Sequence, residues 1–447
     1  MINNLQIQVV VLAAGQGTRM NSDIPKILHT LGGRPVLYYV LDLAHQMTPQ
    51  DIILVINPSL KNMHTPFTHQ TVVQHPAQGT GDAVKWALPH VKKEGYVLIL
   101  YGDTPLVLKE TLARMIDLAH SRPEMAVIVL GMRPLDKQDY ARLILNEKGE
   151  VEDIIEHKDL ASSQKEISLC NSGVMLIRSD LLESFLVALK PNNAAKEYYL
   201  TDLIKIARLA GHPCGIVEGE ASEFMGINTR QDLAKAEGTL QKRWRDKAMT
   251  EGVTFIDPHH TYLSYDTNLE SDVTLHPFVV LGTGVTIEKG AEVLPFCRLS
   301  DTTVGSRASV GPFAHLRGGT YLQERTEIGN FVEVKNSTVG PEAKVKHLSY
   351  IGDTDIGSKT NVGAGTITCN YDGFSKFKTQ IGNGVSIGSN SSLIAPLSIG
   401  DYAIVGAGSV ITQDVESDTL VIARSKQINI EKGAIKFREK REKRKDF

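Results

Sequence analysis

The chain has 447 residues, 42% of them hydrophobic and 22% charged, which is the composition of a globular protein long enough for two or three domains. Its formal net charge of −3 argues against nucleic-acid binding as the main activity. The four cysteines are too widely spaced for a zinc site or a disulfide framework, so we expect free thiols and a cytoplasmic location.

Up to about residue 230, strand-like apolar runs alternate with amphipathic helix patterns. The expected strands are 8–14, 51–56, 96–103 and 125–132, and the expected helices are 35–47, 80–88 and 111–120. The first apolar run has the length of a strand, far short of a membrane span, and we expect no membrane insertion. This alternation predicts a Rossmann-like α/β domain with a mostly parallel sheet between two helical layers. Ligands of such folds bind at the carboxyl ends of the strands.

A glycine loop follows the first strand, in the stretch VVLAAGQGTRMNSDIPKIL at residues 10–28. A dinucleotide fingerprint would need a third glycine where Met20 stands, and a P-loop would need Gly-Lys-Ser/Thr where the chain has Gly17-Thr18-Arg19. Both common nucleotide loops are therefore excluded. Glycines let a backbone approach a nucleotide closely, and Arg19 and Lys26 add positive charge for its phosphates. The alternative is a tight turn that carries two surface cations.

A charged segment with helical spacing separates two different sequence textures. We expect a nucleotide-binding domain over residues 1–230, a helical linker over 231–251 and a second domain over 252–447. The tail from residue 430 onward is basic overall but contains several glutamates, and we expect a solvated, partly helical end.

The second domain repeats an aliphatic residue every six positions, with a few shorter steps. Hexads suit a triangular coil whose sides are short strands, and they predict a left-handed parallel β-helix. A polar stretch, CNYDGFSKFKTQ, interrupts the series after Thr368, and we expect it to form a loop outside the coil that carries binding function. The expected inward residues are Leu263, Leu269, Leu275, Leu281, Ile287, Val293, Leu299, Val304, Val310, Leu316, Leu322, Ile328, Val334, Val339, Val345, Ile351, Ile356, Val362, Ile381, Ile387, Leu393, Ile399, Val405 and Ile411.

Motifs in the first domain resemble those of sugar-phosphate nucleotidyltransferases. After LAAGQGTRMNSDIPKIL come QGTGDA, YGDTPL, VEDIIEHKD, CNSGV, EYYLTD and GINTR, in that order. With the hexapeptide β-helix behind it, the set is similar to one bacterial family, the bifunctional N-acetylglucosamine-1-phosphate uridyltransferases and glucosamine-1-phosphate N-acetyltransferases. The resemblance covers nearly the whole chain.

For the first domain the resemblance implies uridylyl transfer from UTP. Nucleotidyl transfer depends on position and charge neutralisation, and Asp103 at a strand end is a natural ligand for a hard cation. A single Asp at a strand end is otherwise more often a cap or turn residue. The resemblance adds Asn228 as the second Mg²⁺ ligand and Arg19 as the residue that stabilises the pyrophosphate charge. The implied substrate-binding residues are Leu12, Ala13, Ala14, Gly15, Lys26, Gln74, Gly79, Thr80, Tyr101, Gly102, Asp103, Ala141 (where the family usually has Gly), Glu156, Asn171 and Asn228.

For the β-helix the chemistry needs a general base, and His347 in VKHLSYIGD is the candidate because imidazole titrates near neutral pH. The resemblance implies that His347 deprotonates the amine of glucosamine-1-phosphate, with Glu333 orienting or pairing with it. It implies Arg317, Lys335, Tyr350 and Asn361 as contacts to the sugar phosphate. The implied acetyl-CoA contacts are Ala364, Asn370, Tyr371, Ser389, Ala407 and Arg424.

Two positions near Arg317 depart from the family pattern, since His315 replaces an Arg and Gly318 replaces a Pro. Arg317 itself is retained, so we expect the phosphate anchor to remain. A single triangular prism has no deep pocket, so we expect sites between subunits and a homotrimer. The expected partners are small molecules, namely UTP, amino-sugar phosphates and acetyl-CoA.

These observations favour a bifunctional enzyme that makes UDP-N-acetylglucosamine. A second hypothesis is a uridylyltransferase whose β-helix is only an oligomerising scaffold, against which His347 and the Asn370-Tyr371 loop argue. A third is a non-enzymatic binding or assembly protein, for which an intact pair of Asp103 and Asn228 would be unexpected.

Overall fold

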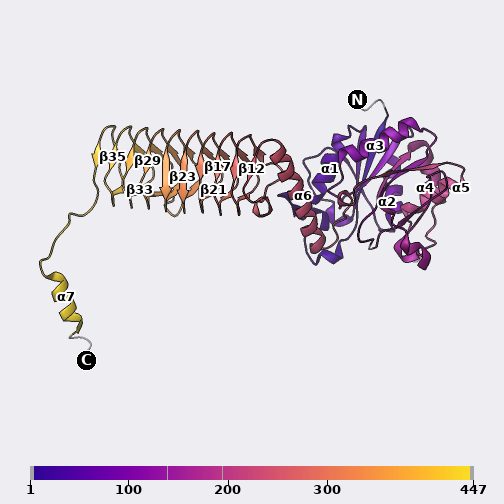
Figure 1. The fold of residues 1–447 in the computed structure, drawn as a ribbon, viewed down its shortest axis with the longest axis horizontal. Helices are drawn as coiled ribbons and strands as arrows, with labels where there is room; N and C mark the ends of the chain where they lie inside the picture. The colour runs from indigo at the N-terminus through magenta and orange to yellow at the C-terminus, as the bar shows by residue number, and fades with distance from the viewer. Residues whose placement is uncertain (1–4, 138, 194, 443–447) are drawn as a thin grey trace. The chain divides into compact units, whose positions relative to one another are not determined.

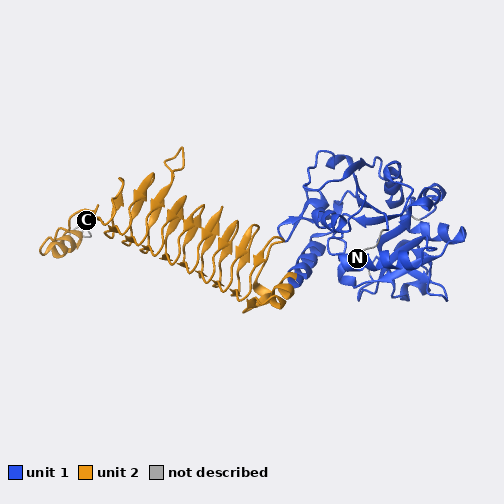
Figure 2. Cartoon of the chain, turned by 90° about the horizontal axis from the view of Figure 1, so that it is seen from above, with its two compact units in different colours: residues 1–243 blue, residues 244–447 orange. Residues whose placement is uncertain are grey.

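The computed structural model describes residues 5–137, 139–193 and 195–442. The chain forms two compact units, unit 1 over residues 1–243 and unit 2 over residues 244–447, coloured separately in Figure 2. Helix α6 (Arg230–Thr250), where a helical linker was expected, contributes residues to both units. No helix among the described residues is long and apolar enough to span a membrane.

A nine-stranded sheet forms the centre of unit 1 (Figure 1). Its main path runs β11-β7-β10-β6-β1-β4-β5, and β8 pairs with β9 and β10. Along this path only β10 runs antiparallel to its neighbours. The strands are β1 (Ile7–Ala13), β4 (Asp51–Ile56), β5 (Gln70–Val73), β6 (Tyr96–Tyr101), β7 (Val127–Met132), β8 (Arg142–Leu145), β9 (Val151–Ile155), β10 (Cys170–Arg178) and β11 (Cys214–Glu218), with β2 (Thr30–Leu31) and β3 (Arg34–Pro35) in a separate pair.

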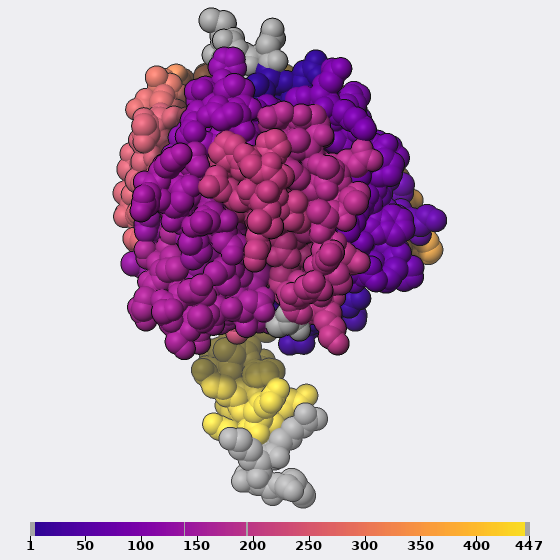
Figure 3. Space-filling model, turned by 90° about the vertical axis from the view of Figure 1, so that its right-hand side faces the viewer, coloured from indigo at the N-terminus to yellow at the C-terminus, as the bar shows by residue number. Residues whose placement is uncertain are grey.

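Helices cover both faces of this sheet, so the expected α/β architecture is confirmed. Val9 and Val11 of β1 belong to the core that includes α1 and α3, whereas Val10 and Leu12 belong to the core that includes α2, α4 and α5. A strand covered on both faces has to be apolar throughout, which explains the continuous aliphatic runs. Figure 3 shows the surface of unit 1, in which side chains fill the gaps between the elements. The helices are α1 (Val36–Gln46), α2 (Thr80–Ala87), α3 (Lys109–Ser121), α4 (Ser179–Ala188) and α5 (Leu203–Leu209).

Short 3-10 helices occupy many of the loops. Two of them lie in the glycine-loop region and a third lies within the EYYLTD motif. They are η1 (Thr18–Met20), η2 (Lys26–Leu28), η3 (Pro58–Leu60), η4 (Leu88–His90), η5 (His157–Asp159), η6 (Ser162–Glu166), η7 (Leu200–Asp202), η8 (Ala221–Glu223) and η9 (Pro258–His260).

Unit 2 is a left-handed parallel β-helix with three faces, as the hexads predicted; its coils follow one another from β12 towards β35 in Figure 1. Leu275 pairs with Val293, Val293 with Val310 and Val310 with Ile328, one coil at a time. The expected inward residues form one core along the unit; all are buried except Leu269, which is partly buried and packs against that core.

The strands of the three faces are short. Face A contains β12 (Thr254–Phe255), β14 (Thr274–Leu275), β17 (Glu292–Val293), β20 (Ser309–Val310), β23 (Glu327–Asn330), β26 (Lys344–His347), β29 (Asn361–Val362), β32 (Ser386–Ile387), β35 (Ile404–Val405) and β37 (Leu420–Val421). Face B contains β13 (Asn268–Leu269), β16 (Val285–Ile287), β19 (Thr302–Val304), β22 (Thr320–Leu322), β25 (Thr338–Val339), β28 (Thr354–Ile356), β31 (Thr379–Ile381) and β34 (Leu397–Ile399). Face C contains β15 (Val280–Leu281), β18 (Arg298–Leu299), β21 (His315–Arg317), β24 (Glu333–Lys335), β27 (Tyr350–Gly352), β30 (Ile367–Cys369), β33 (Ser392–Ile394) and β36 (Val410–Ile411).

One loop leaves the coil where the polar stretch predicted it. Residues 370–378 lie between β30 and β31, and Tyr371 forms an antiparallel bridge with Lys376. The Tyr371 hydroxyl donates to the carbonyl of Gly373 at 2.6 Å. After the coil, the basic tail contains the exposed helix α7 (Gly433–Glu442).

Candidate active sites

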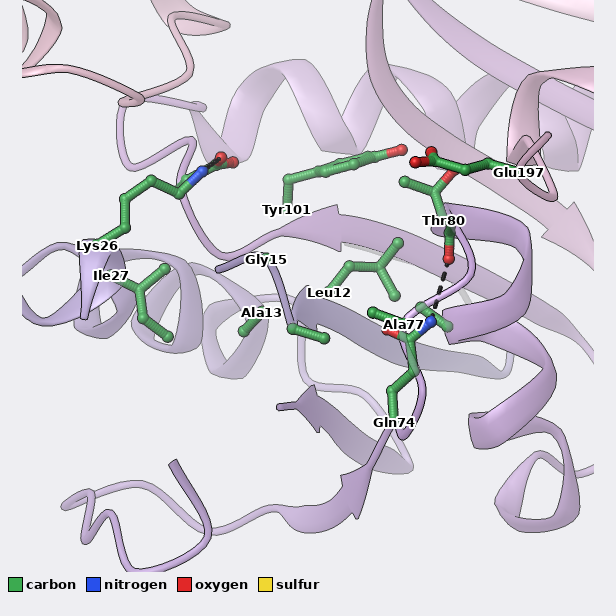
Figure 4. A pocket seen from close by; sticks show the side chains of 14 residues that line it. Leu12, Ala13, Gly15, Lys26, Ile27, Gln74, Ala77, Thr80, Tyr101 and Glu197 are labelled. Carbon is green, nitrogen blue, oxygen red and sulfur yellow. Dashed lines mark hydrogen bonds and ion pairs between the residues drawn. The ribbon is translucent and has the colours of Figure 1, made fainter. Parts of the chain in front are cut away.

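A cavity of about 260 Å³ opens at the carboxyl ends of β1 and β6 in unit 1. Figure 4 shows Lys26 at one end, Glu197 at the other and Tyr101 between them. We call it the strand-end cavity. It brings together most of the nucleotide-site residues that the sequence predicted, and its lining comprises Leu12, Ala13, Ala14, Gly15, Lys26, Ile27, Gln74, Ala77, Gly79, Thr80, Ala83, Tyr101, Asp103 and Glu197.

Two glycines next to this cavity have backbone positions that other residues cannot easily adopt. Gly17 has φ +65°, and a Cβ there would lie 2.5 Å from the Cβ of Lys26. Gly79 has φ +111°, and a Cβ there would lie 2.6 Å from the carbonyl oxygen of Tyr198. Glycine therefore lets the first loop pass close to Lys26 and lets α2 begin at the cavity wall.

Lys26 joins two residues that are distant in the sequence. Its ammonium forms an ion pair with Asp103, and it donates to Oδ1 of Asn228 at 3.0 Å. Both partners offer oxygen atoms, which are the ligands preferred by hard divalent cations, and they already surround a positive charge. The donor set therefore fits Mg²⁺ with phosphate and water as further ligands. Among the described residues, no group of three or more His, Cys, Asp or Glu could hold a metal.

Two weakly acidic side chains lie in this part of the site, since Tyr101 lines the cavity and Glu156 lies near Tyr101. Burial raises the pKa of Tyr101, and the nearby Glu156 raises it further, so the phenol stays protonated. Burial also raises the pKa of Glu156, although Thr201 Oγ1 donates to that carboxylate at 2.9 Å and partly offsets the effect. A Cβ on Gly173 would lie 2.8 Å from the Tyr101 ring, so this glycine gives the ring its space.

Several predicted residues do not line the strand-end cavity itself. Glu156 lies near Tyr101 without lining the cavity, and Asn171 donates its backbone N–H to the carbonyl of Ala141 at 2.9 Å. Gly102 donates its N–H to Leu12 at 2.8 Å and so joins the ends of β6 and β1. Arg19 is exposed and lines a separate hollow, which it shares with Asn228. The structure thus gathers the nucleotide residues but does not place Arg19 among them.

Four lining residues were not predicted from the sequence, namely Glu197, Ile27, Ala77 and Ala83. Glu197 opens the EYYLTD motif, so the motif itself could have pointed to it. Ile27 directly follows Lys26 in the glycine-loop motif. Ala77 and Ala83 carry no chemical group that would have marked them.

In unit 2 the predicted phosphate anchors lie side by side on face C. Arg317 pairs with Lys335 in the register of β21 and β24. The Arg317 guanidinium also donates to Glu333 Oε1 at 2.9 Å and 2.7 Å. Within this chain the ion-pair partner of Glu333 is Arg317, and a role of Glu333 in orienting or pairing with His347 stays a prediction.

The remaining predicted contacts to the sugar phosphate are divided between two faces. Tyr350 pairs with Glu333 on face C, close to the anchors. Asn361 lies on face A, where it is exposed and pairs with Lys344 in β26. Gly318 has φ +65°, which proline cannot adopt, so the departure from the family pattern suits this turn.

His347 lies exposed at the end of β26 and contacts Asn330, another residue that the sequence analysis overlooked. Its Nδ1 is 2.6 Å from Oδ1 of Asn330. When the Nδ1–H of His347 donates to this amide oxygen, Nε2 is left unprotonated and can take a proton. The tautomer is the one that a general base at Nε2 requires.

Three predicted residues align with His347 in successive coils, and a fourth, Arg424, contacts the last of them through its side chain. His347, Ala364 and Ser389 accept at their backbone oxygens from Gly365, Asn390 and Gly408, at 3.2, 2.7 and 2.8 Å. Ala407 continues the column and accepts from Arg424 Nη1 at 2.6 Å. The predicted base and these acetyl-CoA contacts therefore follow one edge of the β-helix, which we call the His347 column.

The chain is similar to known proteins across both units. The family model of the MobA-like NTP transferase domain matches residues 9–196, and that of the bacterial transferase hexapeptide (six repeats) matches residues 378–413. The chain is 44% identical to the bifunctional protein GlmU of Paramagnetospirillum magneticum over 97% of each chain. It is 46% identical to the bifunctional protein GlmU of Rhodospirillum rubrum over 93% of each chain. It is 41% identical to that of Zymomonas mobilis, over 97% of this chain and 98% of the relative.

Proposed function

The chain belongs to the family of bifunctional GlmU proteins, and from this premise we propose how its residues share two reactions. It is an enzyme with a nucleotidyltransferase domain and a hexapeptide acyltransferase domain. One reaction transfers an acetyl group from acetyl-CoA to glucosamine-1-phosphate. The other joins the resulting N-acetylglucosamine-1-phosphate to UTP, which gives UDP-N-acetylglucosamine and pyrophosphate.

We assign uridylyl transfer to the strand-end cavity, and the meeting of Lys26, Asp103 and Asn228 carries this assignment. The sugar phosphate attacks the α-phosphate of UTP, a reaction that needs aligned phosphates and neutralised charge rather than covalent help from the protein. Asp103 and Asn228 would hold Mg²⁺, which supplies positive charge to the phosphates when bound. Lys26 brings its ammonium to the same phosphates.

The other residues of unit 1 orient the two substrates. Gln74, which donates to Asp82 Oδ2 at 2.7 Å, lies with Gly79 and Thr80 where the uracil and ribose would bind. The backbone from Leu12 to Gly15 would follow the nucleotide, with Tyr101 and Gly102 near it. We assign Glu156, Asn171 and the backbone of Ala141 to the amino sugar. Arg19 would have to turn toward the cavity to meet the departing pyrophosphate.

We assign acetyl transfer to the His347 column. Nε2 of His347 takes a proton from the glucosamine amine while the amine nitrogen attacks the thioester carbonyl carbon. The new C–N bond replaces the C–S bond, and the coenzyme A thiolate leaves and receives the proton. Arg317 and Lys335 hold the sugar phosphate, and Tyr350 and Asn361 complete its contacts. Ala364, Ser389, Ala407 and Arg424, with Asn370 and Tyr371 of the loop, bind acetyl-CoA.

We further propose that the enzyme is a homotrimer in the cytoplasm. The assigned acetyltransferase residues lie on two faces and one edge of a single β-helix, which supports sites completed by a neighbouring chain. UTP and acetyl-CoA, the proposed substrates, are metabolites of the cytoplasm. Sedimentation equilibrium should give about three times the chain mass of 49.0 kDa; a mass of one chain would reject the trimer.

The direct test is a product assay by mass spectrometry. Purified protein is given glucosamine-1-phosphate, acetyl-CoA, UTP and Mg²⁺, and we expect UDP-N-acetylglucosamine, pyrophosphate and free coenzyme A. Chelation of Mg²⁺ should stop the reaction at N-acetylglucosamine-1-phosphate, because only the phosphate chemistry is assigned to the metal. Absence of coenzyme A release would reject the second activity, and absence of pyrophosphate would reject the first.

A further inference from the structure

A buried carboxylate lies between the two assigned substrate subsites of the β-helix. Asp353 occupies the turn between β27 and β28, and only 9% of its surface is exposed. Its φ is +49°, in the left-handed region. The equivalent turns of the three preceding coils contain Asp301, Gly318 and Asn336, which have φ of +46°, +65° and +46°. Since Gly and Asn also make this turn, the backbone alone does not require a carboxylate at position 353.

Both oxygens of this carboxylate are engaged by side chains. Asn336 Nδ2 donates to Oδ1 at 2.5 Å, and Asn370 Nδ2 donates to Oδ2. The Lys335 ammonium lies 3.7 Å from Oδ2. Burial disfavours the charge, yet hydrogen bonds from Asn336 and Asn370, with Lys335 beside them, hold the pKa of Asp353 below its ordinary value. The group is therefore a fully bonded anion.

The backbone of Asp353 contacts the residue that follows loop 370–378. Its carbonyl oxygen accepts from the N–H of Thr379 at 3.1 Å, while its side chain binds Asn370. Within the loop base, Phe377 donates its N–H to the carbonyl of Asn370 at 2.9 Å. Asp353 thus contacts both Asn370, which starts loop 370–378, and Thr379, which follows it.

We propose that Asp353 is a positioning residue for acetyl transfer that fixes the phosphate anchor and the acetyl-CoA loop relative to each other. Through Lys335 it acts on the sugar phosphate, and through Asn370 it acts on acetyl-CoA. This inference rests on the proposed acetyltransferase function and on the assignment of those two residues. Asp353 itself need not touch either substrate.

An Asn side chain at position 353 could not make the contacts that Asp353 makes. Two amide donors, Asn336 and Asn370, each point at one carboxylate oxygen. An amide at position 353 offers a single acceptor, so one donor would face another N–H group. The amide would also leave Lys335 without the negative charge beside it. The loss of a buried hydrogen bond to a charged group is large enough to measure as a change in KM.

The test compares Asp353→Asn with Asp301→Asn, a control with the same substitution in the exposed equivalent turn of an earlier coil. Asp353→Asn is expected to raise the KM for both glucosamine-1-phosphate and acetyl-CoA about tenfold, with kcat changed less. Uridylyl transfer by the same protein should stay at the wild-type rate. Asp301→Asn should leave both KM values unchanged.

A double-mutant comparison separates positioning from general stability. In a Lys335→Met background, Asp353→Asn should still raise the KM for acetyl-CoA but no longer that for the sugar phosphate, because the two residues act through one contact. If Asp353→Asn does not fold, Asn336→Ala frees one carboxylate oxygen and should raise both KM values by a smaller factor.

The inference is overturned if Asp353→Asn or Asn336→Ala folds with only one of the two KM values raised. It is also overturned if both KM values are unchanged while Tm falls. Loss of acetyl transfer in the wild-type protein is a different result, since it would reject the proposed function before Asp353 is tested.

Discussion

Replacing Asp103 by Asn is expected to lower the kcat of uridylyl transfer on the order of 10²–10³-fold while acetyl transfer continues. Of the two expected ligands that contact Lys26, Asp103 and Asn228, only Asp103 carries a negative charge. Asn keeps the shape of the side chain but removes that charge, so a divalent cation would be bound by two neutral groups. The ammonium of Lys26, whose side chain is 10% exposed, would also lose its ion pair.

Pyrophosphate release with UTP and N-acetylglucosamine-1-phosphate measures this effect. Asp180→Asn is a suitable control, because Asp180 also belongs to unit 1 and forms an ion pair with Arg178 at 2.6 Å, yet does not line the cavity. It should change kcat little. Acetyl transfer by the Asp103→Asn protein reports whether the chain is folded. A variant that keeps uridylyl transfer within tenfold of wild type would contradict the assignment of Asp103.

Replacing His347 by Ala is expected to lower the kcat of acetyl transfer on the order of 10²–10⁴-fold and to leave uridylyl transfer intact. The contact with Asn330 engages Nδ1 and leaves Nε2 for the proton, and Ala has no group that could replace it. The side chain is exposed, and the coil core consists of aliphatic residues, so the fold should not suffer.

Release of the coenzyme A thiol measures the acetyl transfer. His276→Ala provides the matched control, since His276 lies in unit 2 just after β14 and contacts Glu292 at 2.8 Å, outside the His347 column. The control should retain acetyl transfer. Full activity of His347→Ala would instead favour a β-helix that serves only as a scaffold, the second hypothesis of the sequence analysis.

The sequence predicted the two folds, and the structure brings together many of the residues that the sequence assigned to the two sites. In unit 1, alternation of apolar runs identified the strands and helices, and Asp103 and Lys26 were recognised from motifs at strand ends. The sequence did not reveal that Arg19 lies outside the strand-end cavity and that Glu197 lies inside it. Those placements depend on how loops pack over the sheet edge, which no local pattern encodes.

The repeat of the β-helix contains further information about which residues are neighbours in successive coils. Coils stack through parallel pairing, so residues about one coil apart become neighbours. Asn330 lies 17 residues before His347, and Asp353 lies 17 residues from both Asn336 and Asn370. Counting coils would therefore have placed Asn330 beside His347. The same count would have shown that Glu333 aligns with Tyr350.

The sequence by itself determined the neighbours within the β-helix, because the hexads, with their shorter steps and the one loop counted, set which residues stack. It also determined the layered character of unit 1, because strands buried on both faces must be apolar. Only the tertiary structure decided that Lys26 meets Asp103 and Asn228, which lie 77 and 202 residues away along the chain. That meeting requires β1 and β6 to be adjacent and the segment before α6 to return to the same sheet edge, and long-range packing sets both conditions.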